Sequence, residues 1–133
     1  MRYLLILKAD EASESGVPPG DEELAERGRY TTQLVRAGVL LAGEGLAPSA
    51  EGARVVYSGE GRAVTAGPFA KTEELMAGFW LIQPADEEEA VEWARRIPLR
   101  SGCVEVRRVY DEAEIERGAS DVRKEDEWRE AGR

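Results

Sequence analysis

Histidine is absent from the 133-residue sequence, and cysteine occurs once, at Cys103. Histidine has the ordinary pKa nearest neutrality and most often serves as a general base or metal ligand. Any catalysis must therefore use carboxylates, tyrosine, lysine, arginine or Cys103. A single cysteine cannot form an internal disulfide, which fits a reducing cytoplasm. No histidine is present to activate Cys103, which we expect to be an inert, small apolar residue.

Long apolar runs and basic clusters are also missing. The first apolar stretch, residues 3–7, is far shorter than the roughly 20 residues of a membrane-spanning helix, and it lacks the features of a signal peptide. We therefore expect a cytoplasmic protein without membrane contact. Acidic residues outnumber basic ones by 27 to 18, so nucleic-acid binding is not expected. No phosphate loop, dinucleotide fingerprint or metal-ligand cluster occurs, so we expect neither a cofactor nor a metal.

The residues that are present predict one α+β domain over residues 1–110 and a charged tail over residues 111–133, partly helical or disordered. Apolar periodicity and turn residues give the order of elements. They are a strand at 2–8, a loop at 9–20, a helix from 21 that ends before Gly38, a strand at 39–45, a hairpin at 53–57 and 62–65, a strand at 78–82, a helix capped by Asp86 and ended by Pro98, and a strand at 103–109. This order matches a ferredoxin-like split βαβ unit with an inserted β-hairpin.

Both faces of the predicted sheet are apolar, although two helices can cover only one. In the first strand, Leu5 and Leu7 alternate with Leu4 and Ile6. An uncovered face of several hundred Å² corresponds to about 10 kcal/mol of gross burial, at about 25 cal/mol per Å². The sequence therefore predicts a homodimer, or a higher oligomer built from it. The alternative is that the loop at 9–20 or the acidic tail covers this face.

Five segments together resemble one family. In chain order they read RYLLIL, AGVLLAGEGL, AGPFAKTEE, GFWLIQPADEEEAVEWARRIP and VEVRRV. Over residues 1 to about 110 the sequence is similar to the YCII-related family, specifically to its DGPF-type branch, whose name motif reads DGPFAETKE. The resemblance implies a dimeric α+β barrel, in which two ferredoxin-like sheets pack face to face.

The resemblance implies less about activity. Most members of the family have no established activity, some relatives resemble muconolactone isomerases and dehalogenases, and a His/Asp pair has been proposed as their active site. This sequence has no histidine, Ala66 replaces the Asp of the name motif, and Lys71-Thr72-Glu73 replaces Glu-Thr-Lys. The family's acid/base pair therefore does not carry over. DGPF-type proteins are also thought to accompany extracytoplasmic-function sigma factors, which implies a sigma factor as a further candidate partner.

Glu44 is the first candidate for a catalytic residue. It lies between Gly43 and Gly45 at the end of an apolar strand, where desolvation would raise its pKa into the range of a general base. The flanking glycines permit a ligand to approach closely, and they equally suit a bulge. The structural alternative is a strand-end carboxylate that pairs with an arginine or faces water.

Four further residues are candidate ligand contacts, namely Phe69, Trp80, Glu105 and Arg107. Glu105 and Arg107 share one face of the last strand and are predicted to point into the space between two sheets. Phe69 with Trp80 or Phe79 would supply the apolar walls of a pocket for a small organic ligand. The alternatives are that the charged pair bridges a dimer interface and that the aromatic residues belong to the core.

Three functions stay open at this point. The first is a small-ligand-binding or protein-interaction dimer without catalysis. The second is a small lyase, isomerase or dehalogenase-like enzyme that uses Glu44 as its base, and the third is a sigma-factor accessory. The lack of histidine, and of any nucleophile beside a base, favours the first.

Overall fold

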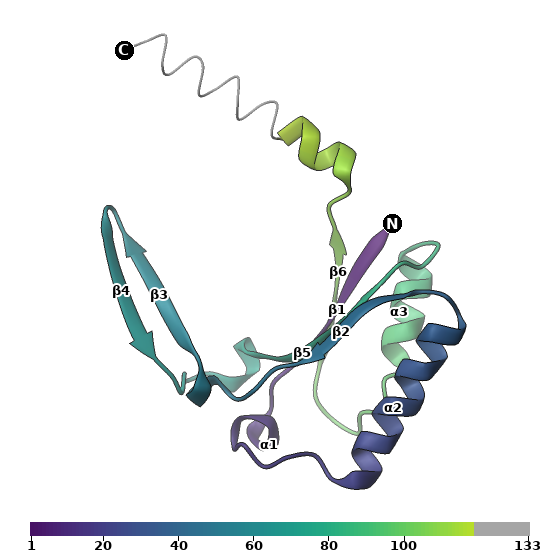
Figure 1. Ribbon diagram of the computed structural model, residues 1–133, viewed down its shortest axis with the longest axis horizontal. Coiled ribbons are helices and arrows are strands. Elements are labelled where there is room, and N and C mark those ends of the chain that lie inside the picture. The colour runs from purple at the N-terminus through teal and green to yellow at the C-terminus, as the bar shows by residue number, and fades with distance from the viewer. Residues whose placement is uncertain (119–133) are drawn as a thin grey trace.

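The computed structural model describes residues 1–118 of the chain as a mixed α+β fold with two antiparallel sheets (Figure 1). In chain order its elements are β1 (Arg2–Lys8), α1 (Glu11–Glu14), α2 (Asp21–Arg36), β2 (Leu40–Gly45), the 3₁₀ helix η1 (Ser49–Glu51), β3 (Ala53–Ser58), β4 (Gly61–Ala66), the 3₁₀ helix η2 (Thr72–Glu74), β5 (Met76–Ile82), α3 (Glu87–Arg95) and β6 (Val104–Val109). The predicted strands and the two main helices are confirmed, and so is the α+β class.

The main sheet has the strand order β2-β5-β1-β6, and every neighbouring pair of strands is antiparallel. Helices α2 and α3 lie against the same face of this sheet (Figure 1). We call the opposite face the open face. The register places two rows of its side chains across the four strands. From β2 to β6, the rows are Glu44, Phe79, Ile6 and Glu105, and Ala42, Leu81, Leu4 and Arg107.

The core lies between the sheet and the two main helices. Its buried members are Tyr3, Leu5, Tyr30, Leu34, Val39, Trp80, Ile82, Ala90, Trp93 and Ile97. The Tyr30 ring contacts Trp80 edge-on with 5.2 Å between ring centroids, and its hydroxyl donates to the backbone carbonyl of Trp93 at 2.7 Å. This aromatic contact and hydrogen bond join α2, the sheet and α3 at one point.

Helix α3 follows directly from its local sequence. The carboxylate of Asp86 accepts the backbone N–H of Glu89 at 2.9 Å, which satisfies one of the free donors at the start of the helix. Ala90, Trp93 and Ile97 then point into the core at helical spacing.

The loop predicted at residues 9–20 contains the short helix α1. Its cap is reciprocal, because the carboxylate of Asp10 accepts the N–H of Ser13 at 2.8 Å and the Ser13 hydroxyl accepts the N–H of Asp10 at 2.9 Å. No residue of α1 is buried. Apolar periodicity therefore gives no signal for this helix.

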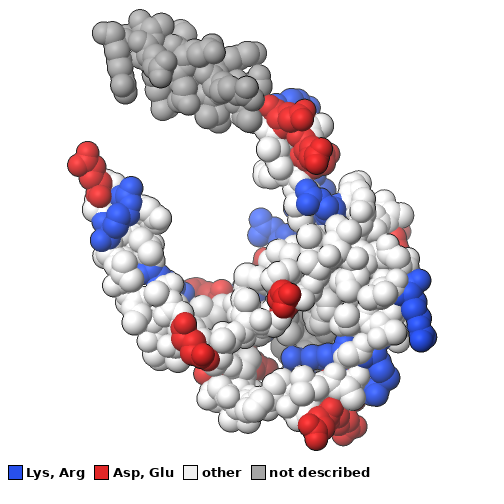
Figure 2. Space-filling model, in the orientation of Figure 1, with Lys and Arg blue, Asp and Glu red and all other residues white. Residues whose placement is uncertain are grey.

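The hairpin of β3 and β4 is a separate two-stranded sheet. It stands away from the main sheet, and an open space lies between the two (Figures 1 and 2). All residues of both strands are exposed, including Val55, Val56, Tyr57 and Val64. The hairpin predicted from the sequence is confirmed, and its position at the periphery is confirmed with it.

The tail begins as a helix over residues 112–118, and the rest of it lies outside the described residues. Two guanidinium nitrogens of Arg108, at the end of β6, donate to the carboxylate of Glu114. These hydrogen bonds lower the pKa of Glu114 to about 2. The pair ties the start of the tail to the edge of the main sheet.

Candidate functional site

The sequence-predicted residues Glu44, Glu105 and Arg107 all lie on the open face, and all three side chains are exposed. Glu44 is on one edge strand of the main sheet, whereas Glu105 and Arg107 are on the other. Three strand spacings separate the edges, or roughly 14 Å. A single chain therefore does not bring these groups into one site.

Trp80 and Phe69 lie apart from the open face. Trp80 is on the face that the helices cover, where its indole N–H donates to the hydroxyl of Thr31 at 3.3 Å. Phe69 follows β4, near the base of the hairpin, and the guanidinium of Arg54 lies 4.0 Å from its ring centroid. Phe79, named as the alternative to Trp80, is half-buried on the open face beside Glu44.

The segment around Phe69 has a structural role that the sequence did not reveal. The carboxylate of Glu14 accepts both the backbone N–H of Ser49, at 2.7 Å, and the Ser49 hydroxyl, at 2.5 Å. The same hydroxyl accepts the N–H of Phe69 at 3.0 Å. Hydrogen bonds from Ser49 lower the pKa of Glu14 below its ordinary value. This Glu14–Ser49–Phe69 clasp holds α1 against η1 and the end of the hairpin.

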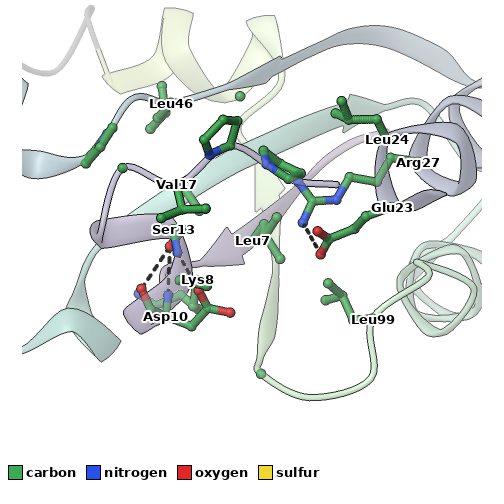
Figure 3. A pocket seen from close by; sticks show the side chains of 18 of the residues that line it. Leu7, Lys8, Asp10, Ser13, Val17, Glu23, Leu24, Arg27, Leu46 and Leu99 are labelled. Carbon is green, nitrogen blue, oxygen red and sulfur yellow. Dashed lines mark hydrogen bonds and ion pairs between the residues drawn. The ribbon is translucent and has the colours of Figure 1, made fainter. Parts of the chain in front are cut away.

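A cavity of about 520 Å³ lies at one end of the main sheet, between the segment 9–20, the start of α2 and the loops after β2 and α3. Its volume is typical of sites for small organic molecules. Most of its wall is apolar and comes from Pro18 and from Leu7, Val17, Leu24, Leu46 and Leu99 (Figure 3).

Three of these apolar side chains are largely exposed to solvent. Val17 is 69 % exposed, Leu24 51 % and Leu46 47 %. Exposed apolar residues that gather around one hollow, instead of lying singly on the surface, are typical of a binding site. None of the residues predicted from the sequence as site residues indicated this cavity.

Arg27 is the main polar group that enters the cavity. Its side chain extends from α2 toward Leu7 and Val17 (Figure 3). One terminal nitrogen lies 3.5 Å from a carboxylate oxygen of Glu23, and the buried Nε has no hydrogen-bond partner among the described residues. Lys8, Asp10 and Ser13 also line the cavity, but Asp10 and Ser13 are engaged in the cap of α1.

A smaller hollow of about 220 Å³ adjoins the cavity and shares Leu7, Arg27, Gly45 and Ala77 with it. Glu44 lines this hollow, together with Phe79 and Trp80. Three of the residues singled out from the sequence therefore border the space next to Arg27, whereas Phe69, Glu105 and Arg107 do not line either hollow.

Within residues 1–118, no group of three or more acidic or cysteine side chains is arranged to hold a metal ion. No helix in this part of the chain is both long and apolar enough to cross a membrane.

Comparison with known proteins identifies the family. The model of the YCII-related domain matches residues 1–113. The chain belongs to the YCII-related family. This YCII-related chain is also similar to "Uncharacterized protein R00369" of Rhizobium meliloti (strain 1021), with 33 % identity over 97 residues, which covers 71 % of this chain and 78 % of the relative. Neither match assigns a reaction, substrate or partner.

Proposed function

We propose that this YCII-related protein is a homodimeric small-ligand-binding protein whose ligand occupies the cavity beside Arg27. The observation that carries the proposal is the cavity itself, which combines about 520 Å³ of space with apolar walls and a guanidinium. Such a combination suits recognition of a small organic molecule. Binding alone requires no histidine, which agrees with the composition of the chain.

The topology of the main sheet supports a dimer. The order β2-β5-β1-β6, with α2 and α3 as crossovers, agrees with a ferredoxin-like split βαβ unit that carries the hairpin as an insertion. In such a unit one sheet face stays free to pack against a second copy, as in a dimeric α+β barrel. The AGPF segment at residues 66–69 favours the DGPF-type branch of the family.

The open face has the composition of a dimer interface. Its centre consists of Leu4, Ile6, Phe79 and Leu81, and no main helix covers it. Charged side chains lie on the two edge strands. In a two-fold pair of sheets, Glu44 on β2 of one copy can meet Arg107 on β6 of the other copy. This pairing of opposite charges favours one orientation of the two sheets.

The dimer is tested by Leu81→Arg, which places a charge at the centre of the open face. Val35→Arg is the matched control, because Val35 lies on α2 and is already 59 % exposed. Sedimentation equilibrium should report a dimer for the wild type and the control, and a folded monomer for Leu81→Arg. A wild-type monomer at all concentrations would refute the dimer.

Ligand binding is tested by a thermal-shift screen of small organic molecules. A ligand at 100 times its Kd should stabilise the protein by about 2.7 kcal/mol. Ala12→Phe fills the cavity from α1 and should abolish the shift, whereas Ala25→Phe, on exposed α2 surface outside the cavity, should not. A hit that binds Ala12→Phe as tightly as the wild type would place the ligand elsewhere.

A second candidate function is a small lyase, isomerase or dehalogenase-like activity with Glu44 as the general base. The observation that favours it is that Glu44 borders the hollow adjoining the cavity. Lactones and small acids should be screened for turnover. Glu44→Gln should then lower kcat at least tenfold, and Glu105→Gln, across the sheet, should not. Undiminished turnover in Glu44→Gln would exclude this role.

A further inference from the structure

The guanidinium of Arg27 lies in the cavity, and no strong ion pair or hydrogen bond among the described residues explains why it lies there. Its contact with Glu23 is a single long one of 3.5 Å between side chains that are 30 % and 51 % exposed. An exposed ion pair of this kind contributes little to stability. The Nε group is buried and donates no hydrogen bond among the described residues. The donors open to a ligand are therefore the two terminal nitrogens, one of which has only this long contact with Glu23.

The surroundings of Arg27 favour a ligand with a single negative charge. A planar guanidinium binds a carboxylate through two parallel hydrogen bonds, and these bonds are stronger inside an apolar pocket than in water. Lys8 and Arg27 are balanced by Asp10 and Glu23 in the lining of the cavity. With no excess of positive charge, the cavity is poorly suited to a dianion such as a phosphate monoester.

We propose that the ligand of this cavity is a small organic monocarboxylate, whose charged end pairs with the terminal nitrogens of Arg27 and whose apolar body lies against Leu7, Val17 and Leu46. This inference rests on the ligand-binding function proposed above and adds the chemical class of the ligand. The carboxylate displaces the Glu23 carboxylate from Arg27. Glu23 then turns toward solvent, where it is already half exposed.

Three probes of similar shape test the inference by calorimetric titration: 3-phenylpropionate, its neutral amide and phenyl phosphate. The wild type should bind the acid at least tenfold more tightly than either of the other two. In Arg27→Gln the preference for the acid over the amide should fall below threefold. Arg29→Gln removes the same charge from an exposed position on the same helix, and it should keep the full preference.

Arg27→Lys provides a second variant that keeps the charge but loses the planar fork. It should still prefer the acid, with a smaller ratio than the wild type. This variant also decides the matter if Arg27→Gln does not fold by circular dichroism.

The outcomes separate this inference from the function on which it rests. Equal affinity for acid and amide in the wild type, or an unchanged preference in Arg27→Gln, would overturn the carboxylate assignment and leave ligand binding in place. Tighter binding of phenyl phosphate would replace the carboxylate by a phosphate. If neither these probes nor the broader screen yields a molecule that binds, the proposed function fails together with the inference.

Discussion

Tyr30→Phe removes one hydroxyl from the core and leaves the aromatic packing in place. The hydroxyl donates to the carbonyl of Trp93 at 2.7 Å. That carbonyl also accepts the backbone N–H of Arg96 at 3.2 Å, so it keeps a partner in the variant. The cost should therefore be the net value of one hydrogen bond, about 1 kcal/mol, and not the larger penalty of an unsatisfied buried acceptor.

Urea unfolding at neutral pH and fixed protein concentration measures this loss. Tyr57→Phe is the matched control, because Tyr57 is 68 % exposed on the hairpin, and it should change the free energy of unfolding by less than about 0.3 kcal/mol. A loss in Tyr30→Phe no greater than in the control would contradict the role of the hydroxyl. A loss above about 3 kcal/mol would show that the ring had moved as well.

The same residue gives a pH dependence. Burial raises the pKa of Tyr30 above its ordinary value, although Arg96 opposes the shift. The stability that this shift provides is complete below the unfolded pKa of about 10 and is lost as pH rises toward the folded pKa, because only the unfolded chain releases the proton. Above pH 10 the wild type should therefore lose stability more steeply than Tyr30→Phe. Parallel curves would refute the assignment of the buried phenol.

Three further predictions concern the backbone and the clasp. A Cβ at Gly67 would lie 1.7 Å from the carbonyl oxygen of Ser49, so Gly67→Ala should lower the free energy of unfolding by about 3 kcal/mol; a neutral result in urea unfolding would contradict this packing. Gly28→Ala, in mid-helix with no atom beyond the adjacent helix backbone within 4 Å of the added carbon, should instead raise the free energy of unfolding by about 0.5–1 kcal/mol, and a loss would reveal a hidden contact. Hydrogen bonds from Ser49 lower the pKa of Glu14, so the clasp contributes stability above the unfolded pKa and loses it as pH falls through the lowered folded pKa. The amide shift of Ser49 in NMR should report this transition below pH 4.5, and a midpoint at or above that ordinary value would argue against the clasp.

Local signals explain what the sequence predicted well. The cap at Asp86 and the spacing of Ala90, Trp93 and Ile97 lie within about three helical turns, so α3 can be recognised without knowledge of the rest of the fold. The alternation in β1 likewise predicted an apolar side chain on each face. Both predictions depend on neighbours in the chain, and tertiary structure did not override them.

The cavity could not be predicted in this way. Leu7, Val17, Leu46 and Leu99 come from four distant segments, and each alone has the pattern of an ordinary apolar residue. Arg27 alone has the pattern of a solvated charge on a helix surface. The site exists only because the fold brings these segments to one end of the sheet.

The face of the sheet on which each site residue lies was the hardest property to predict. Trp80 alternates with Phe79 and Leu81 in β5, and nothing in the sequence indicates which set faces the helices. The register of β2 against β5 shifts between Leu40 and Ala42. This register shift decides on which face of the sheet Glu44 lies. Where the shift occurs depends on the pairing with β5, which the sequence of β2 alone does not reveal.

Both edge strands of the main sheet have charged side chains on the open face. They are Glu44 on β2 and Glu105 and Arg107 on β6. An additional strand from another molecule would have to desolvate these groups in order to extend the sheet. Charged edges of this kind discourage sideways polymerisation into fibrils. The arrangement thus guards a chain with an apolar sheet surface against amyloid-like growth.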